Sequence, residues 1–349
     1  MSTRVLSIGD PHFKISNTSE TDKCVERILE IIDSKDIDFV VILGDLLHDH
    51  ETLHTIPLNK AINFVKEVSK RCLTFVLVGN HDMINHDQFL TENHWMNSMK
   101  MWSNVFIVDY PMQYIFNDMK FIFAPYVNTG RFEECLDKVD NWRDASCIFA
   151  HQEFYGCDFG HVPSVKGDKW SEENPEVISG HIHSRQKVGD NVYYPGSVMQ
   201  HAFGESEKNV IPYTIFTKGE KKYELEEIDL QLPRKVNIKV KMEELDELEI
   251  PETEDTMRVV ISGTSEEFKI FKTTEKYKKL AENPKVKIKY KSVIEDVEEG
   301  GEDIELSKNT FLELLKETIV KDPDYPDELM TDFNHIFLGD KKDNDVILV

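Results

Sequence analysis

Aspartate and histidine side chains follow several apolar runs of this sequence, twice as a pair two residues apart. Asp10 and His12 come directly after Val5–Ile8 and Gly9, and His181 and His183 follow the run that ends at Ile178. In an extended chain, side chains at positions i and i+2 point to the same side. A carboxylate beside an imidazole suits a divalent transition metal. A single Asp-x-His motif is more often an ordinary turn, so the interpretation depends on the rest of the chain.

Three further clusters follow predicted strands, the position at which open α/β sheets place their sites. They are Gly44-Asp45-Leu46-Leu47-His48-Asp49, Gly79-Asn80-His81-Asp82 and His151. A pair of metal ions about 3.5–4 Å apart needs ligands from several segments and one carboxylate that bridges both ions. The predicted ligands are Asp10, His12, Asp45, Asn80, His151, His181 and His183. Oxygen and nitrogen donors without thiolate favour manganese or iron over a structural zinc site.

Short apolar runs separated by loops predict the strands that position these clusters. The predicted strands are Val5–Ile8, Phe39–Leu43, Thr74–Val78, Phe121–Phe123, Cys147–Ala150, Val177–Ile178 and Val192–Tyr194. Helical spacing of apolar residues in Cys24–Ile32 and Leu58–Val68 predicts helices between the first three, with a helix start near Thr21. This order predicts an α/β fold class, with layered sheets flanked by helices.

Composition describes a globular chain of 349 residues with 40% hydrophobic and 30% charged residues. The sequence contains no run of about 18 apolar residues, so we expect no transmembrane helix. The first predicted strand begins too early for a signal peptide. The five scattered cysteines lack C-x-x-C spacing, which favours reduced thiols and a cytoplasmic protein. The chain as a whole has a net charge of −24 and should repel nucleic acid, whereas residues 231–291 carry about +2.

Changes in pattern divide the chain into four parts. Residues 1–232 form the α/β domain, and residues 233–294 form a small α+β module with strands at Val236–Lys241, Met257–Ile261 and Val286–Ser292 and a helix at Ser265–Ala281. Residues 295–304 form an acidic linker, and residues 305–349 contain two short amphipathic helices. A basic stretch at 266–291 has nine lysines against four glutamates.

The motif series D-x-H, G-D, G-N-H-D, H and G-H-x-H over residues 1–200 resembles the calcineurin-like metallophosphoesterase superfamily. His48, three residues past Asp45, and Tyr194-Pro195-Gly196-Ser197 resemble the branch of SbcD-type DNA-repair nucleases, most closely its members in T-even bacteriophages. The resemblance implies a β-sandwich flanked by helices, a capping module and C-terminal helices. An arginine expected in the protein-phosphatase branch is replaced by Asp49-His50-Glu51.

By position, the resemblance implies one metal on Asp10, His12, Asp45 and His183, and the other on Asp45, Asn80, His151 and His181. Two Mn²⁺ ions are expected, with Mg²⁺ as the alternative. His81 would face the scissile phosphate and His48 would help to place DNA. The implied activity is 3′-to-5′ duplex trimming and single-strand nicking in recombination and double-strand-break repair. The implied assembly is a homodimer bound to an SMC-like coiled-coil ATPase through residues 305–349.

Several alternatives stay open at this point. His81 is either a catalytic group or an orienter of Asp82, and the terminal helices either pack on the α/β domain or bind a partner. The basic stretch is either a solvated face or a DNA-binding surface. Its candidate DNA contacts are Lys269, Lys272, Lys276, Lys279, Lys287 and Lys289. A phosphodiesterase or phosphatase for a small substrate competes with the nuclease hypothesis, and a metal-free scaffold competes with both.

Overall fold

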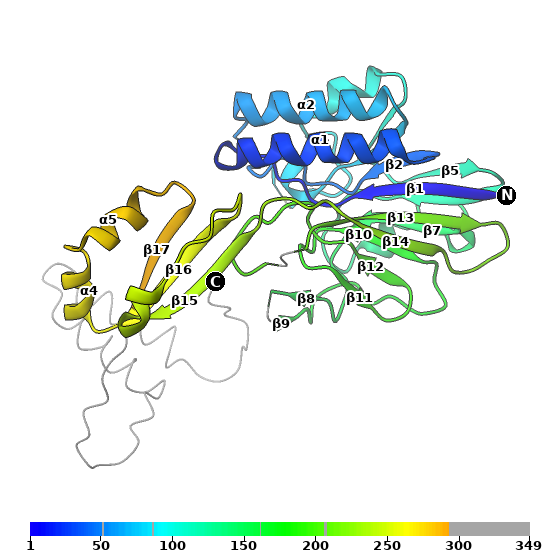
Figure 1. Ribbon diagram of the computed structural model, residues 1–349. Helices are drawn as coiled ribbons and strands as arrows, with labels where there is room; N and C mark the ends of the chain where they lie inside the picture. Colours follow the sequence, from blue (N-terminus) through cyan, green and yellow to red (C-terminus); the bar gives the residue numbers. More distant parts are fainter. Residues whose placement is uncertain (51, 86, 161, 206–207, 293–349) are drawn as a thin grey trace, which may run out of the picture. The chain divides into compact units, whose positions relative to one another are not determined.

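The computed structural model describes residues 1–292, apart from 51, 86, 161 and 206–207, and contains two six-stranded sheets (Figure 1). The first sheet has the order β14 (Glu224–Asp229), β13 (Val210–Thr217), β1 (Ser2–Ile8), β2 (Phe39–Ile42), β3 (Leu73–Leu77) and β4 (Val105–Val108). The second has the order β11 (Gln186–Val188), β12 (Val192–Tyr194), β10 (Val177–Gly180), β7 (Cys147–His151), β6 (Met119–Phe123) and β5 (Met112–Phe116). A two-stranded hairpin pairs β8 (Asp158–Phe159) with β9 (Val162–Pro163).

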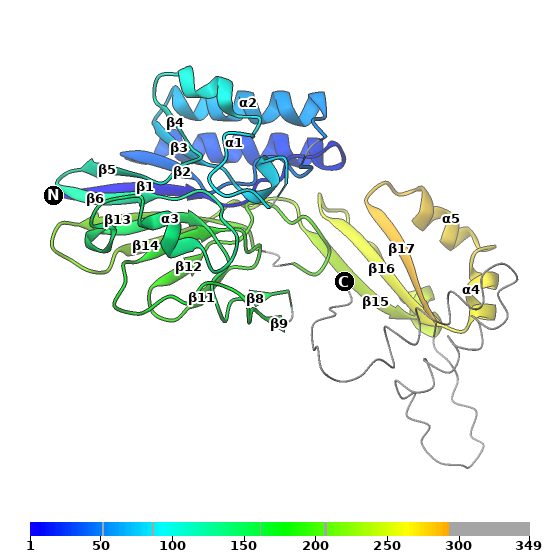
Figure 2. The ribbon, with the colours of Figure 1, turned by 180° about the vertical axis from the view of Figure 1, so that it is seen from behind.

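Aromatic side chains fill the space between the two sheets. Phe39 of the first sheet lies edge-on to Phe121 and Phe149 of the second, with ring centroids 5.3 and 6.1 Å away. Helices α1 (Thr18–Ser34) and α2 (Thr55–Ser69) cover the outer face of the first sheet. Helix α3 (Phe132–Leu136) packs on the outer face of the second (Figure 2). The α/β fold class expected from the sequence is therefore confirmed.

The parallel strands of each sheet bring their carboxyl ends together. In the first sheet β1, β2, β3 and β4 are parallel, with Ile8 beside Ile42 and Ile42 beside Val76. In the second sheet β6, β7, β10 and β12 are parallel, with His151 beside Gly180. The loops that follow these strands carry the Asp and His clusters, so the register of the sheets decides which clusters can meet.

Seven of the observed strands were not predicted from the sequence: β4, β5, β8, β9, β11, β13 and β14. Strand β13 contains Pro212, a residue that argues against an interior strand because it has no amide hydrogen to donate. In the structure Pro212 lies beyond the last residue pair with β1, which joins Leu6 to Tyr213. The amide hydrogen that Pro212 lacks is therefore not needed in the ladder between β1 and β13. Most residues of β13 are buried.

Residues 235–292 form a separate parallel sheet in the order β15 (Lys235–Lys241), β16 (Thr256–Gly263) and β17 (Val286–Ser292). The single helix expected at Ser265–Ala281 is wrong, because two helices occur there: α4 (Ser265–Phe271) and α5 (Glu275–Glu282). The hydroxyl of Thr274 donates to the carbonyl of Phe271, the last residue of α4. The same hydroxyl accepts from the Tyr277 amide and so caps the N-terminus of α5. A threonine with these local bonds competes with a continuous helix.

Two ion pairs join this module to the body of the protein: Lys235 with Glu20, at 2.7 Å, and Lys23 with Glu254, at 2.6 Å. All five cysteines are buried and unpaired. No helix among the described residues is both long and apolar enough to span a membrane. The expected linker at 295–304 and the expected helices at 305–349 lie outside the described residues.

Candidate metal centre

All seven predicted ligands lie at carboxyl ends of parallel strands from both sheets. Asp10 and His12 follow β1, Asp45 follows β2 and Asn80 follows β3. His151 is the last residue of β7, and His181 and His183 follow β10. The structure brings the seven side chains together into two groups that share Asp45.

The first group contains Asp10, His12 and His183, whose ligand atoms all lie within 4.8 Å of one another. The Nε2 atoms of His12 and His183 are 3.0 Å apart. Two imidazole nitrogens this close must share a proton or a cation. Burial lowers the pKa of His12 well below its ordinary value, so its ring is neutral, which is the form that binds a metal.

The second group contains Asp45, His151 and His181, again with ligand atoms within 4.8 Å of one another. The side-chain oxygen of Asn80 lies 3.0 Å from His151 Nε2 and 2.9 Å from His181 Nδ1. His151 donates from Nδ1 to the Leu43 carbonyl at 2.6 Å, which turns its Nε2 toward the group. A ring oriented in this way by a backbone carbonyl is typical of a metal-binding histidine.

Asp45 lies between the two groups. Its Oδ2 atom is 3.5 Å from His12 Nε2 and 3.3 Å from His151 Nε2. Its Oδ1 atom accepts the His81 backbone amide at 2.9 Å. Burial raises the pKa of Asp45, but His151 and the other histidines around it outweigh burial and hold the pKa well below the ordinary value. The carboxylate is therefore charged and is placed to serve both groups.

These donors fit two divalent cations. Asp10 is fully buried, and its Oδ2 atom has no hydrogen-bond partner among the described residues. Burying a charged oxygen without a partner costs free energy unless a cation compensates it. Burial alone would lower the pKa of His151, but Asp45 and Asp10 raise it to about 9, so a proton provides part of this compensation. A metal ion would displace that proton.

The local backbone is not the extended chain expected from the i, i+2 spacing. Asp10, His12 and Asp45 have φ angles of 38°, 43° and 51°, and His181 has 81°. Non-glycine residues seldom adopt such angles, which cost about 1–3 kcal/mol each and occur mainly at functional sites. The side chains converge because the loops turn sharply after each strand. Hydrogen bonds such as that from the His181 amide to Asp10 Oδ1, at 2.8 Å, hold these turns.

Gly79 and Gly44 leave the space that these ligands occupy. A Cβ atom on Gly79 would lie 2.2 Å from Asp45 Oδ1, and one on Gly44 would lie 2.5 Å from His151 Nδ1. Gly44 also has a φ of 103°, which favours glycine. Gly44 and Gly79 are thus required for close approach of the ligands rather than only for ending a strand.

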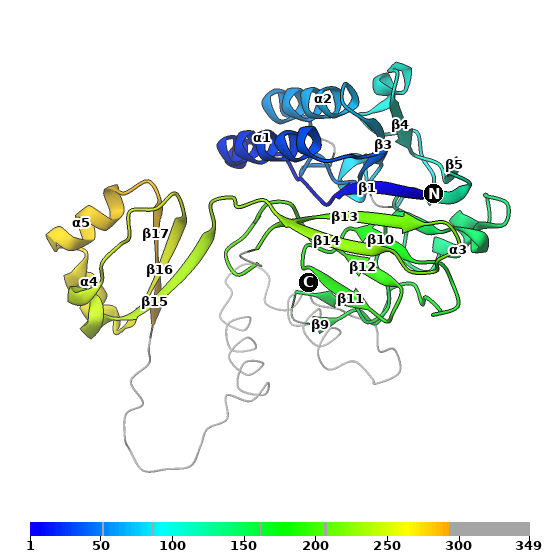
Figure 3. The ribbon, with the colours of Figure 1, turned by 45° about the vertical axis from the view of Figure 1, so that its right-hand side comes forward.

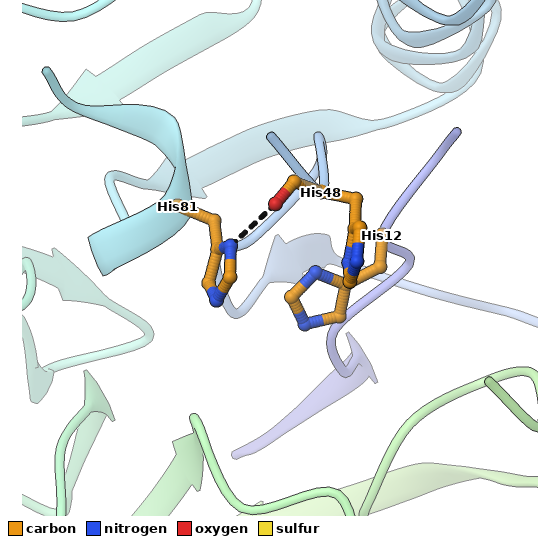
Figure 4. A group of neighbouring side chains, drawn as sticks. All are labelled: His12, His48 and His81. Atoms are coloured by element: carbon orange, nitrogen blue, oxygen red, sulfur yellow. Dashed lines mark hydrogen bonds between the residues drawn. The ribbon is translucent and has the colours of Figure 1, made fainter. Parts of the chain in front are cut away.

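His81 and His48 lie beside the first group (Figure 4). The Nδ1 atom of His81 donates to the His48 carbonyl at 2.5 Å, so its Nε2 atom is left for another partner. Its ring lies edge-on to His12, with centroids 4.8 Å apart. Burial and then Lys14 lower the pKa of His48, which favours a neutral ring. His81 therefore has a fixed orientation and one available ring nitrogen.

Three residues at the site were not among the predicted site residues. Asp82 is buried and accepts from the Gly79 amide at 3.1 Å and from the Trp95 indole at 3.0 Å. His201 bonds through Nε2 to the Asp10 carbonyl at 3.1 Å, and Glu205 Oε1 lies 3.9 Å from His183 Nδ1. Asp82 stands inside the Gly-Asn-His-Asp motif and could have been found there. His201 and Glu205 follow no strand, so the sequence offers no such signal for them.

Comparison with known proteins agrees with this geometry. A model of the calcineurin-like phosphoesterase family matches residues 3–195, the part that contains all seven ligands. The chain is 48% identical over 275 residues to the provisionally named phosphoesterase 244L of Invertebrate iridescent virus 6, covering 77% of this chain and 97% of that protein. It is 48% identical over 285 residues to the provisionally named phosphoesterase 078R of Invertebrate iridescent virus 3, covering 80% and 81%.

Two solved structures resemble the chain only distantly. A novel archaeal phosphodiesterase superposes with a TM-score of 0.34 and 13% identity, over 65% of this chain and 100% of that one. A purple acid phosphatase from yellow lupin superposes with a TM-score of 0.43 and 13% identity, over 67% and 53%. Likeness of this degree carries no argument about function.

Replacing Asp45 by Asn should remove both metal ions, because the bridging charge is lost from both groups. We expect metal affinity to fall by more than about 100-fold at both positions, whereas Asp10→Asn should affect mainly the first group. Metal content after dialysis against Mn²⁺, measured by mass spectrometry, tests this. Asp49→Asn is the matched control in the same loop and should keep both ions. Two ions retained by Asp45→Asn would refute the bridging role.

Proposed function

This chain belongs to the calcineurin-like phosphoesterase family, and we propose that it is a two-metal nuclease that cleaves DNA at phosphodiester bonds. Metal-dependent phosphoester hydrolysis follows from the family and from the ligand set, whereas DNA as the substrate is the proposal. The observation that supports DNA is a basic surface on a chain whose net charge is −24.

That surface is one face of the β15–β16–β17 sheet, which we call the basic face. Alternate residues of the strands point to opposite sides. Val240, Val259 and Ile261 belong to one apolar cluster with Phe271 of α4 and Leu280 of α5, the two helices that Figure 3 shows beside this sheet. By register, the opposite side holds seven cations and no acidic residue. The seven are Lys235, Lys239, Lys241, Arg258, Lys287, Lys289 and Lys291.

Only two of the six candidate DNA-contacting lysines lie on the basic face. Lys287 and Lys289 lie on it and are exposed, whereas Lys269, Lys272, Lys276 and Lys279 lie on or beside the helices of the other side. The helical lysines alternate with glutamates, and Lys276 donates to the Asp246 carbonyl at 2.8 Å. A sheet face with no acidic residue of its own and five exposed lysines is the better phosphate-binding surface. We therefore favour the sheet over the helices as the DNA contact.

A single loop connects the basic face with the metal ligands. Arg258 lies over the Phe203 ring at 4.1 Å, and Lys287 lies over the same ring at 5.7 Å. Two residues before Phe203, His201 bonds to the Asp10 carbonyl, and two residues after it, Glu205 lies beside His183. A phosphate backbone held on the basic face would therefore lie next to the chain segment that supports the first metal group.

Two divalent ions at this site, proposed as Mn²⁺ with Mg²⁺ as the alternative, would supply a hydroxide nucleophile at neutral pH and offset the phosphate charge. Asp45, His12 and His151 would hold the ions in a buried site that excludes most water. His81, oriented by its bond to the His48 carbonyl, presents Nε2 toward the substrate side and can stabilise or protonate the leaving oxygen. His48 would help to place the DNA.

His81→Asn should lower the turnover number by about 10²–10⁴-fold, the usual effect of losing a general acid. Metal content should stay at the wild-type value, because His81 is not required as a ligand. Steady-state cleavage rates together with metal analysis test this. His54→Asn, at a partly exposed histidine of the neighbouring segment, is the control. Near-wild-type turnover would leave His81 as an orienter of Asp82 only.

DNA cleavage itself is tested with Mn²⁺ and three substrates: linear duplex DNA, single-stranded DNA and a small chromogenic phosphodiester. We expect trimming of the duplex from 3′ ends and nicking of the single strand, with Asp45→Asn inactive. Lys239, Lys289 and Lys291 form no ion pair with the described residues, and their triple change to Gln should reduce the salt slope of DNA binding by roughly 2–3.

The matched triple variant changes Lys269, Lys272 and Lys279 to Gln and has the same net charge. It should affect the salt slope much less. Hydrolysis of the chromogenic substrate without any DNA cleavage would favour a small-molecule phosphodiesterase instead. A metal-free scaffold is disfavoured because every ligand position is intact and converges.

We also propose a role in recombination and double-strand-break repair, as a homodimer bound to an SMC-like coiled-coil ATPase. This proposal rests on the resemblance to SbcD-type nucleases, because residues 305–349 lie outside the described residues. A chain that ends at residue 304 should keep metal-dependent cleavage but should no longer co-purify with such an ATPase. Unchanged co-purification would refute docking through residues 305–349.

A further inference from the structure

Tyr126 lies beside the second metal group, and nothing described so far gives it a role. It follows β6, whose carboxyl end is at the same edge of the sheet as that of β7, the strand that ends in His151. The centroid of its ring lies 5.4 Å from that of His181 and 6.1 Å from that of His151. The side chain is partly exposed, so it packs against two predicted ligands and is still reached by solvent.

The backbone around Tyr126 is held by ligand-bearing segments of both sheets. The Tyr126 amide donates to the carbonyl of Val78 at 2.9 Å, and Val78 lies two residues before Asn80 in the first sheet. The next amide, that of Val127, donates to the side-chain oxygen of Gln152 at 3.4 Å, and Gln152 follows the ligand at the end of β7. The position of Tyr126 relative to the second metal group is therefore fixed before any substrate binds.

The hydroxyl of Tyr126 is available as a hydrogen-bond donor. It forms no hydrogen bond with the residues that the structure describes. Burial raises the pKa of Tyr126, and the carboxylates of Glu153 and Asp45 raise it further, so the hydroxyl is protonated at neutral pH. The influence of Asp45 also shows that the hydroxyl lies within electrostatic reach of the bridging carboxylate. A largely buried tyrosine hydroxyl usually has a partner, and a phosphate oxygen bound at the site would supply one.

We propose that Tyr126 is a further catalytic residue, whose hydroxyl donates a hydrogen bond to a non-bridging oxygen of the phosphate that is cleaved. His81 lies beside the first metal group and Tyr126 beside the second, so the two side chains would contact the phosphate from different sides. A donor fixed in advance where negative charge develops stabilises the transition state without the cost of reorganisation. The proposal rests on phosphoester hydrolysis and does not require DNA to be the substrate.

Tyr126→Phe tests the proposal, because it removes one oxygen atom and keeps the ring that packs against His181. With the chromogenic phosphodiester and Mn²⁺, kcat should fall by about 10- to 100-fold, the effect of losing a hydrogen bond to a charged oxygen. KM should change little, because the bond is strongest in the transition state. Both metal ions should remain, as measured by mass spectrometry. Tyr110→Phe, at an exposed tyrosine between β4 and β5, is the control and should keep the wild-type kcat.

Binding of orthovanadate provides a second measurement that needs no turnover. Vanadate can adopt the five-coordinate geometry of a phosphoryl group during transfer, and a residue that acts in the transition state should contribute to the binding of such an analogue. Calorimetry on the full chain loaded with Mn²⁺ should show vanadate binding to Tyr126→Phe about 10- to 100-fold more weakly than to the wild type. Tyr110→Phe should bind it with the wild-type affinity.

Wild-type kcat and vanadate affinity in Tyr126→Phe would overturn the proposal. Loss of metal from this variant would also overturn it, because Tyr126 would then act by supporting the ligands. A defect with DNA alone would place the hydroxyl away from the cleaved phosphate and would count equally against it. Slower hydrolysis of the chromogenic substrate by Tyr126→Phe, with no DNA cleavage by any form of the protein, would support the role of Tyr126 but refute the proposed nuclease. The two hypotheses therefore fail in distinguishable ways.

Discussion

The structure depends on how two buried carboxylates are compensated. Asp10 and Asp45 are 0% and 1% exposed, and moving a carboxylate out of water costs several kcal/mol unless cations or hydrogen bonds replace the water. Four imidazoles and the His81 and His181 amides surround these two groups. The arrangement is electrostatically incomplete without a proton on His151 or metal ions. A metal-dependent phosphoesterase needs such uncompensated carboxylate charge, because that charge gives the site its affinity for cations.

Meeting this requirement imposes conditions on both sheets. The ligands come from β1, β2 and β3 on one side and from β7 and β10 on the other, so the aromatic layer around Phe39 must hold the sheets at a constant distance. The turns after the strands accept unusual φ angles at Asp10, His12, Asp45 and His181. Gly79 must have no side chain, since a methyl group would meet the Asp45 carboxylate. The rigid strand ends therefore hold the turns with positive φ angles in place, and these turns orient the ligand side chains toward one another.

Charge is distributed unevenly over the chain. A net charge of −24 opposes DNA at long range, so any attraction must come from a local surface. The basic face concentrates seven cations on a small sheet, and the loop of His201, Phe203 and Glu205 joins that sheet to the first metal group.

Residue type and order were enough to predict the α/β class, most strand positions and a cluster of seven Asp, Asn and His side chains, because each of these motifs directly follows an apolar run. Sequence alone did not reveal why the ligands converge: an extended i, i+2 geometry was expected, and positive φ angles were found. It missed β13, whose proline looks unsuitable, and it joined α4 to α5 because the cap of Thr274 is only a local side-chain bond. The basic face was also hidden. Its cations alternate with apolar residues along three separate strands, and only the register of those strands brings them to one side.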